Sequence, residues 1–494
     1  MKKVNLLAAA VLAAAFAMPA QADYTPNVNF NGYFRSGVFH GEGGRLTGFE
    51  KNKVGRLGNE ADTYGEIGLG ADIAKVDDTV WSVYTMLAVS DREFSNSWQE
   101  ADRTSDAGVY GNPGDTMRAQ IAFRQYKLNV KGLLDWDKDA SIWVGKNYYR
   151  REDIHITDWY YYDISGNGAG VEDLSVGPGK LSVAWLAKTD ATTSEDVTAS
   201  YNYKKYSLSE DGKKLNEENV SGKINLGSKP VAYRQAQKFD VRYNVGLWDG
   251  ANLQISNLYL VPEEENALVH SNNGNVFGLE LTQGFNGGWN KTVFQWGHAA
   301  YAGAMMWNGD LSWYDGGDTQ DNNGFRFINT GDTTITDSFK IQHVAQYAWG
   351  TKKVDGQDDE KVKFAQLVVR PFLQLTKMTR LIWEAGAYVQ TQKKGDSMNN
   401  VNRGQKLTMA YGITPDASNV WSRPEIRFFV SYIHANNANI YGKVESENVT
   451  RKYGEKDCNA YNVKKDLPFH KNGIMHLFEG SCRFHQKDQI CDAA

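Results

Sequence analysis

The stretch REDIHITDWYYYDISGNGAG, residues 151–170, combines charged side chains with a row of aromatic rings. Arg151, Asp153, Asp158 and Asp163 surround one tryptophan and three consecutive tyrosines, and a glycine-rich turn follows. A pyranose sugar needs both kinds of group, because its apolar C–H faces stack on aromatic rings and its rim carries hydroxyl groups. Charged partners make the stronger hydrogen bonds to such hydroxyls. The stretch therefore predicts a sugar-binding surface.

The same pairing of a tyrosine with a charged residue recurs twice near the N-terminus. Tyr33 and Arg35 lie two residues apart, as do Tyr64 and Glu66. Residues two apart share one face of a β-strand. If these segments are strands, each pair points to the same side.

Strict alternation of apolar and polar residues is the main structural signal along the chain. In KFDVRYNVGL, residues 238–247, one face is apolar and the other carries Lys238, Asp240 and Arg242. Segments of about ten alternating residues between polar stretches are typical of a transmembrane β-barrel, which must close on itself because an open edge cannot face hydrocarbon. The polar stretches 40–56, 91–118, 308–336 and 392–405 are expected to be extracellular loops. A secreted all-β protein, such as a sandwich or a solenoid lectin, shows the same alternation and stays an alternative at this point.

Composition and the N-terminus limit the possible classes of protein. The 494 residues carry a net charge of −5, which gives no electrostatic footprint for a nucleic acid. The sequence MKKVNLLAAAVLAAAFAMPAQA has a basic start, an apolar run and an Ala20-Gln21-Ala22 cleavage site, so we expect residues 1–22 to be a signal peptide. A membrane anchor is the alternative, but the apolar run is short and a cleavage site follows it. No later segment approaches the ~18 apolar residues of a membrane-spanning helix.

Several stretches resemble the maltoporin (LamB-type) family of outer-membrane sugar porins. They are VNFNGYFRSG (28–37), GRLGNEADTYGEIGLG (55–70), AFRQYKLNVKG (122–132), SIWVGKNYYRREDIHITDWYYYDISGNGAG (141–170) and VWSRPEIRFF (420–429). The resemblance implies an all-β fold over residues 23–455, namely an 18-stranded antiparallel transmembrane β-barrel with long extracellular loops. It also implies a homotrimer in the outer membrane of a Gram-negative bacterium. The function implied is passive diffusion of maltose and maltodextrins, without a cofactor or a metal.

The resemblance assigns roles to individual residues. It implies a slide of aromatic rings formed by Tyr33, Tyr64, Trp98, Trp289 and Trp421, with Trp98 reaching into the pore of a neighbouring subunit. It implies a polar track and constriction formed by Arg35, Arg56, Glu66, Arg124, Arg151, Asp153, Asp158, Tyr160 and Asp163. The related sucrose porins differ at the constriction, where Arg151, Tyr160 and Asp163 match the maltodextrin type. A sucrose or general oligosaccharide porin remains the alternative.

The C-terminal tail, residues 456–494, departs from this family. It contains Cys458, Cys482 and Cys491 but no clear alternating strand and no terminal Phe or Trp. The irregular cysteine spacing does not predict a metal site, and export favours oxidation of thiols. We expect an altered or missing closing strand, and therefore poor assembly, unless residues 473–484 form a strand.

Enzymatic functions are weaker hypotheses. Glycoside hydrolysis uses two carboxylates, and Asp153 and Asp158 are candidates. However, Arg150 and Arg151 would keep neighbouring carboxylates ionised, so neither is suited to act as an acid. His155 and Ser165 lack a nucleophile motif for lipase chemistry. We expect a channel and not an enzyme; a general diffusion porin and a sugar-binding protein without transport remain further alternatives.

Overall fold

The computed structural model describes residues 27–38, 45–46, 50–60, 62–91, 120–208, 215–264, 270–353, 359–395, 397–435, 444–445 and 474–485. The predicted slide residue Trp98 lies outside these described residues, as do Cys458 and Cys491. Within them, no helix is both long enough and apolar enough to cross a membrane.

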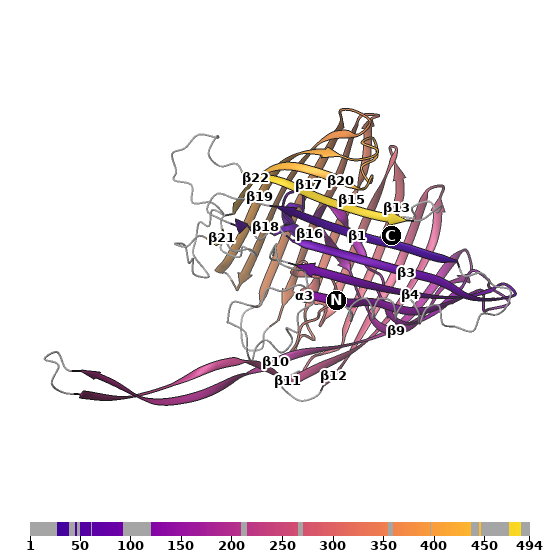
Figure 1. Cartoon of the computed structure of the whole chain (residues 1–494). Coiled ribbons are helices and arrows are strands. Elements are labelled where there is room, and N and C mark those ends of the chain that lie inside the picture. Colours follow the sequence, from indigo (N-terminus) through magenta and orange to yellow (C-terminus); the bar gives the residue numbers. More distant parts are fainter. Residues whose placement is uncertain are drawn as a thin grey trace.

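One large antiparallel sheet contains most of the described chain (Figure 1). Its first strands are β1 (Val28–Val38), β3 (Thr63–Val76), β4 (Thr79–Asp91), β5 (Gln120–Lys131), β6 (Ser141–Asn147) and β9 (Gly166–Val176). It continues through β10 (Gly179–Leu208), β11 (Leu215–Trp248), β12 (Ala251–Glu264), β13 (Gly274–Phe285), β14 (Gly288–Ala299), β15 (Asn323–Thr336) and β16 (Phe339–Lys352). The last strands are β17 (Glu360–Gln374), β18 (Thr379–Lys394), β19 (Ser397–Ile413), β20 (Glu425–Ala435) and β22 (Ile474–His485).

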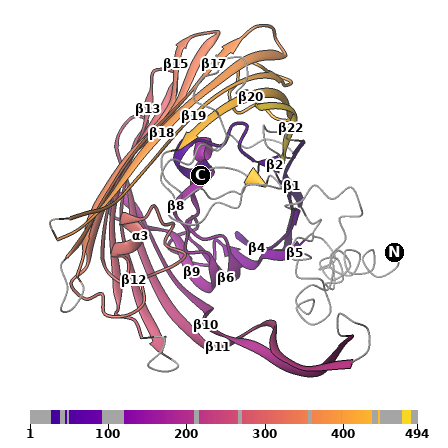
Figure 2. The same cartoon turned by 90° about the vertical axis from the view of Figure 1, so that its left-hand side faces the viewer.

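Hydrogen-bonded pairing joins these strands into a ring. Each strand pairs with its neighbour in chain order from β3 to β20, with β6 pairing directly to β9. β1 pairs with β3 on one side and β22 on the other, and β22 also pairs with β20. Figure 2 looks toward the open end of this cylinder. Such closure gives hydrogen-bond partners to backbone N–H and C=O groups, which hydrocarbon cannot provide.

The backbone of β22 occupies the closing position. It runs in register with β1 from Asn31↔His485 to Val38↔Phe478. Its register with β20 is interrupted once, between Arg427 and Phe429. Residues 474–485 therefore take the place of the strand that the sequence left in question.

The polarity of the ring is the reverse of that of a soluble protein. In β11, Phe239 and Val241 are each 43% exposed, whereas Lys238 and Asp240 are 1% and 0% exposed. The same alternation places Phe30 and Phe34 of β1 and Ile67 of β3 on the outer surface. An apolar exterior around a polar interior is the arrangement that lipid requires.

Two of the four predicted loops contain a substantial part of a strand of the large sheet. Stretch 308–336 contains β15, and stretch 392–405 contains the first half of β19. The prediction was wrong because polar inward residues, such as the buried Arg326, alternate with Phe325 and Phe327 and lower the mean hydropathy of the segment.

Short elements fold into the enclosed space (Figure 2). They are α2 (Lys51–Val54), β7 (Glu152–Ile154), the 3-10 turn η1 (His155–Thr157), β8 (Trp159–Tyr162) and α3 (Ala302–Met306). α2 packs on β17 and β18, and α3 packs on β14, β15 and β16. Gly386 of β18 allows α2 to approach, because a Cβ there would collide with the carbonyl oxygen of Val54. β2 (Arg45–Leu46) and β21 (Val444–Glu445) are not part of the large sheet and pair with each other.

A long two-stranded ribbon extends beyond the sheet (Figure 1). β10 pairs with β9 only up to Ala187, and β11 pairs with β12 only from Arg234. The remaining residues of β10 and β11 pair with each other alone, up to Leu208↔Leu215.

Candidate functional site

A charged cluster forms where the inward segment Glu50–Glu60 meets Asp158. We define the charged cluster as Arg35, Lys51, Arg56, Glu60, Asp62 and Asp158. Arg35 donates two hydrogen bonds to Asp62, from Nε at 2.8 Å and from Nη2 at 2.7 Å. Arg56 Nε donates to Glu60 at 2.9 Å. Asp158 lies 3.5 Å from both Arg35 Nη1 and Arg56 Nη1 and also accepts from Lys51.

Neighbouring cations lower the pKa of two carboxylates of the charged cluster, those of Asp158 and Glu60. Burial alone would raise the pKa of Asp158, but Arg56, Lys51 and Arg35 outweigh this effect and hold the pKa below its ordinary value. Burial likewise opposes ionisation of Glu60, yet Arg35, Arg56 and Lys51 hold its pKa well below the usual range. The site therefore contains fixed charges of both signs.

Three buried residues fasten this inward segment to the wall. We call Arg370, Glu384 and Lys406 the anchor network. Glu384 accepts hydrogen bonds from Arg370 Nε at 2.7 Å, from Lys406 Nζ at 2.6 Å and from the Leu57 N–H at 3.0 Å. Arg370 also donates to the carbonyl oxygen of Ile156 at 3.1 Å. The network thus connects both inward segments to β17, β18 and β19.

A second group of residues places Arg151 between two tyrosine rings. The guanidinium carbon of Arg151 lies 4.2 Å from the ring centre of Tyr148 and 4.1 Å from that of Tyr160. Its Nε lies 3.3 Å from Asp163. Cations in this position are attracted by the ring faces. The two rings and the guanidinium therefore pack together at the edge of the inward segment.

Tyr148 joins this edge to the wall. Its hydroxyl donates to Glu66 at 3.1 Å and accepts a hydrogen bond from Arg124. Tyr64 also donates to Glu66. The aromatic rings of β3 and of the inward segment therefore share one carboxylate.

Aromatic side chains line the inner surface in two groups. The rings of Tyr33 and Tyr64 lie 6.1 Å apart, and the Tyr33 hydroxyl accepts from Arg56 at 2.8 Å. Trp421, in the turn before β20, lies 5.1 Å from the ring of His155. His155 connects the two groups, because Arg56 Nη1 also donates to its carbonyl oxygen at 3.5 Å.

Asp332 of β15 lies beside both Trp421 and Trp289. All three residues are near the end of the ring at which short turns join successive strands, such as the turn between β13 and β14. The Trp421 indole N–H donates to Asp332 Oδ2 at 2.9 Å. Trp289 is the direct cross-strand partner of Asp332 on the neighbouring β14. The tryptophans therefore continue the aromatic surface beyond His155.

Buried hydrogen bonds hold the segment 148–165 against the part of the wall formed by β11 and β15. Asp240 of β11 accepts from Arg150 at 2.9 Å and from Tyr162 at 2.8 Å. On the other side, Arg326 donates to the carbonyl oxygen of Tyr161 at 2.6 Å. Because these partners are buried and charged, the segment is fixed rather than loosely inserted.

The structure brings most of the predicted site residues together. Tyr33, Tyr64, Arg35, Arg56, Glu66, Arg124, Arg151, Asp158, Tyr160 and Asp163 all take part in the contacts above. Asp153 lies 3.8 Å from His155 and is the cross-strand partner of Tyr160. Trp289 lies on β14, where it is the cross-strand partner of Asp332.

Sequence reasoning did not assign several residues to the site, namely Lys51, Glu60, Asp62, Tyr148, Asp332, Arg370, Glu384 and Lys406, and it named His155 only as a weak candidate for lipase chemistry. Two of them carried a local signal. Glu60 follows Arg56 by four residues, and Tyr148 precedes Arg151 within the same charged and aromatic stretch. Lys51 and Asp62 lie in an irregular segment whose inward position no periodicity predicts.

Comparison with known proteins gives consistent matches over most of the chain. A family model described as LamB porin matches residues 28–459. Maltoporin 1 of Klebsiella pneumoniae subsp. pneumoniae is 34% identical over 440 residues, which cover 87% of this chain and 92% of that protein. Maltoporin 2 of Yersinia pseudotuberculosis serotype O:1b is 34% identical over 421 residues, covering 82% and 87%.

Solved structures with similar coordinates are more distant in sequence. OccAB2 of Acinetobacter baumannii has 9% sequence identity and a TM-score of 0.45, with 93% of this chain and 98% of that chain covered. In-vitro folded OmpT, an outer membrane protein of Vibrio cholerae, has 11% identity and a TM-score of 0.41, with 94% and 100% covered.

Proposed function

Because the chain belongs to the LamB porin family, we propose that it conducts maltose and maltodextrins by passive diffusion as a trimer of 18-stranded barrels. The protein is an outer-membrane sugar porin of a Gram-negative bacterium and not an enzyme. The ring of paired strands supports the proposed strand number.

One observation carries the choice of substrate. Tyr33, Tyr64 and Trp421 face the interior, and fixed charges of both signs lie next to the two tyrosines. A channel for ions alone needs charges but no aromatic surface. A glucose unit uses both, since its C–H faces stack on the rings while its hydroxyl groups bond to Arg and Asp.

We assign the aromatic slide to Tyr33, Tyr64, Trp98, Trp289 and Trp421. We assign the polar track and constriction to Arg35, Arg56, Glu66, Arg124, Arg151, Asp153, Asp158, Tyr160 and Asp163. Several weak contacts in sequence suit transport, because each site must release the sugar as readily as it binds it.

The proposal also covers the ends of the chain. Residues 1–22 act as the signal peptide, residues 23–455 supply the maltoporin-like body, and the tail 456–494 replaces the usual closing strand with a divergent one. The pairing of β22 with β1 and β20 supports a tail that closes the ring.

Block of ion current by sugars tests the function. Reconstituted channels should conduct ions, and maltose, maltotriose and maltohexaose should block that current with affinity rising with chain length. Trp421→Ala should weaken block by about 1 kcal/mol, or roughly fivefold, because one stacking surface is lost. Trp136→Ala is the matched control, since Trp136 is 70% exposed on a turn away from the interior.

Two outcomes would contradict the proposal. Ion conduction without block by any maltodextrin would leave a general diffusion pore. Tighter block by sucrose than by maltose would favour the sucrose-porin alternative.

A further inference from the structure

A pocket of about 690 Å³, which we call the wall pocket, lies on the inner side of the ring. It is lined by β1, β3 and β11, by the paired strands β4, β5, β6 and β9 (Figure 2), and by residues 148–150. Ser141 at the start of β6 and Tyr148 after its end both line it, so it reaches from near the short turns to the inward segment. Pockets that bind small molecules have volumes of about 300–1,000 Å³.

The wall pocket adjoins the aromatic slide along β1. Asn31 lines the pocket and lies two residues from Tyr33 on the same face of this strand. Two residues span about 7 Å along a strand. One oligosaccharide chain can therefore contact both places.

Tyr84 of β4 supplies a fixed aromatic ring to the wall pocket. Its direct partner on β3 is Gly70, where a Cβ would lie only 3.3 Å from the ring atom Cδ2. A Cβ at Gly68 would collide with the Tyr84 hydroxyl group. The two glycines therefore let the ring lie along β3, where its hydroxyl donates to Asn31 at 3.0 Å. The ring is partly exposed, so a ligand meets an aromatic surface that is already held in place.

Hydrogen-bond donors line the same pocket. Lys127 Nζ lies 5.9 Å from the centre of the Tyr84 ring and donates to Asn147 at 3.0 Å. An ammonium group has three N–H donors, so Lys127 can also donate to a ligand. Arg242 pairs with Glu172 through Nη2, while its Nε is buried and has no hydrogen-bond partner within the described part of the chain. A ligand hydroxyl group would give this buried donor a partner.

The charges of the lining balance, which favours a neutral ligand. The lining contains three cations and three carboxylates, namely Lys127, Arg150, Arg242, Asp72, Glu172 and Asp173. Arg150 is paired with Asp240 at 2.9 Å. Amide side chains, which both donate and accept hydrogen bonds, supply further polar groups; they are Asn29, Asn31, Gln125, Asn129 and Asn147. An ion would need an excess of opposite charge, whereas a ligand rich in hydroxyl groups uses donors and acceptors together.

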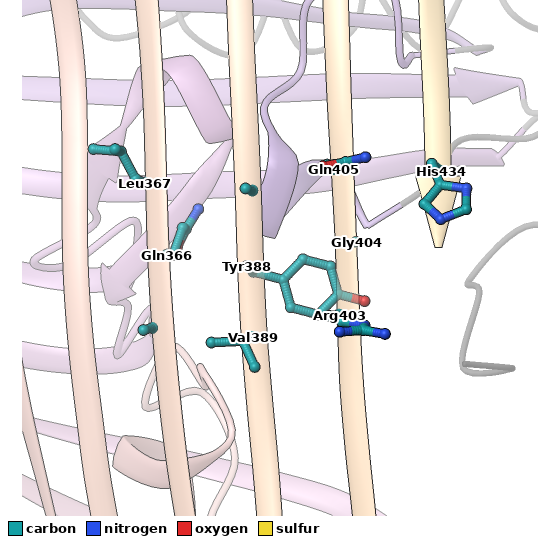
Figure 3. A pocket seen from close by; sticks show the side chains of 10 residues that line it. Gln366, Leu367, Tyr388, Val389, Arg403, Gly404, Gln405 and His434 are labelled. Atoms are coloured by element: carbon teal, nitrogen blue, oxygen red, sulfur yellow. The ribbon is translucent and has the colours of Figure 1, made fainter. Parts of the chain in front are cut away.

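A cavity of similar size on β17, β18, β19 and β20 differs in the accessibility of its tyrosine (Figure 3). Tyr388 is only 6% exposed there. Lys53 Nζ lies 5.1 Å from the centre of its ring, and the ring of Phe364 lies 6.3 Å away. A sugar ring cannot stack on a tyrosine covered in this way. Of these two cavities, the wall pocket is therefore the one suited to a sugar.

We propose that the wall pocket binds one glucose unit of a maltodextrin, as a site separate from the aromatic slide. This inference rests on the proposed function. An apolar face of the glucose unit stacks on Tyr84, and its hydroxyl groups bond to Lys127, Asn129 and Arg242. The long connections of such barrels are extracellular, so the wall pocket lies on the periplasmic side of the inward segment. A sugar that enters from the short-turn side meets the wall pocket before it meets Tyr33.

Single-channel recording with maltohexaose added to one side at a time tests the proposal. In Tyr84→Ala, the rate of entry from the short-turn side should fall about fivefold, because one stacking surface is lost. The rate of entry from the other side should stay native, since the slide is unchanged. Tyr84→Phe keeps the ring and should keep both rates. Tyr126→Ala is the matched control, because Tyr126 of β5 is 50% exposed on the outer face.

Lys127→Gln separates hydrogen bonding from stacking. It should lower entry from the short-turn side about threefold, since a neutral hydrogen bond replaces a charge-assisted one. Heat-modifiable mobility on gels verifies that each variant is folded. Native entry rates in Tyr84→Ala, or an equal loss in Tyr126→Ala, would overturn the wall pocket and leave the proposed function standing. An equal fall from both sides would also overturn it, by assigning Tyr84 to the slide, whereas a native channel that maltohexaose does not block would overturn both proposals.

Discussion

Glu384→Gln tests whether the anchor network sets the width of the channel. The glutamine side chain keeps the shape of Glu384 but removes its charge. Arg370 and Lys406 would then remain buried without the carboxylate that both contact, at 2.7 and 2.6 Å. Removing one partner from a buried ion pair costs about 3–5 kcal/mol. Because the ring keeps all of its backbone pairing, we expect local detachment of residues 50–60 to relieve this cost.

Hydrogen exchange and single-channel recording measure this detachment. A local cost of about 3 kcal/mol corresponds to amide exchange that is roughly a hundredfold faster. We expect this acceleration in residues 50–60, together with higher ion conductance and weaker block by maltohexaose, since Arg56 moves with the segment. Glu360→Gln is the control, because Glu360 lies at the end of β17 and contacts Gln392 rather than an inward segment. Native exchange and native block in Glu384→Gln would refute the reasoning.

Three other perturbations address separate contacts of the site and the wall. The stabilisation from Asp158, whose folded pKa is held below its ordinary value, should be complete above about pH 4 and lost as the pH falls through that lower pKa. The difference in denaturation midpoint between native protein and Asp158→Asn should therefore be constant from about pH 5 to 8 and shrink in stronger acid; a difference that shrinks already near pH 6 would contradict this. Arg151→Ala should raise conductance and cation selectivity, because it removes both a positive charge and the group held between Tyr148 and Tyr160. Arg151→Lys keeps the charge and should keep the selectivity of the native channel. Reversal potentials in a salt gradient measure this selectivity. Deleting Ile474–His485 should abolish heat-modifiable protein in the outer membrane, since each unpaired group on β1 and β20 would cost several kcal/mol in lipid; normal yield would show that another segment closes the ring.

The part of the site that lies on the strands β1 and β3 could be predicted from the sequence. A strand has a period of two, so assigning Phe34 to lipid assigns Tyr33 and Arg35 to the interior. The same reasoning fixed Tyr64 and Glu66, whose hydrogen bond the structure contains. The charged and aromatic residues clustered in 151–163 also predicted a sugar-binding surface.

The remaining half depends on contacts between distant parts of the chain. Glu60 and Asp62 reach Arg35 because Leu57 is bound to Glu384, which lies far along the sequence. No local pattern records such a contact. The prediction of a loop over 308–336 was wrong for a related reason. Arg326 of β15 is polar because it donates a hydrogen bond to the inward segment, at the carbonyl oxygen of Tyr161. Polarity at an inward position can therefore resemble the polarity of a loop.

The alternation of strand faces also determines how this chain can be exported. A polypeptide is retained in the inner membrane when about 18 consecutive apolar residues enter the translocation machinery. Here polar inward residues recur between the outward apolar ones, as in Lys238–Val241, so no described strand presents such a run. The affinity for lipid arises only when strands pair and their apolar residues come together. The chain can thus cross one bilayer as a polar polymer and insert in the next as an apolar cylinder.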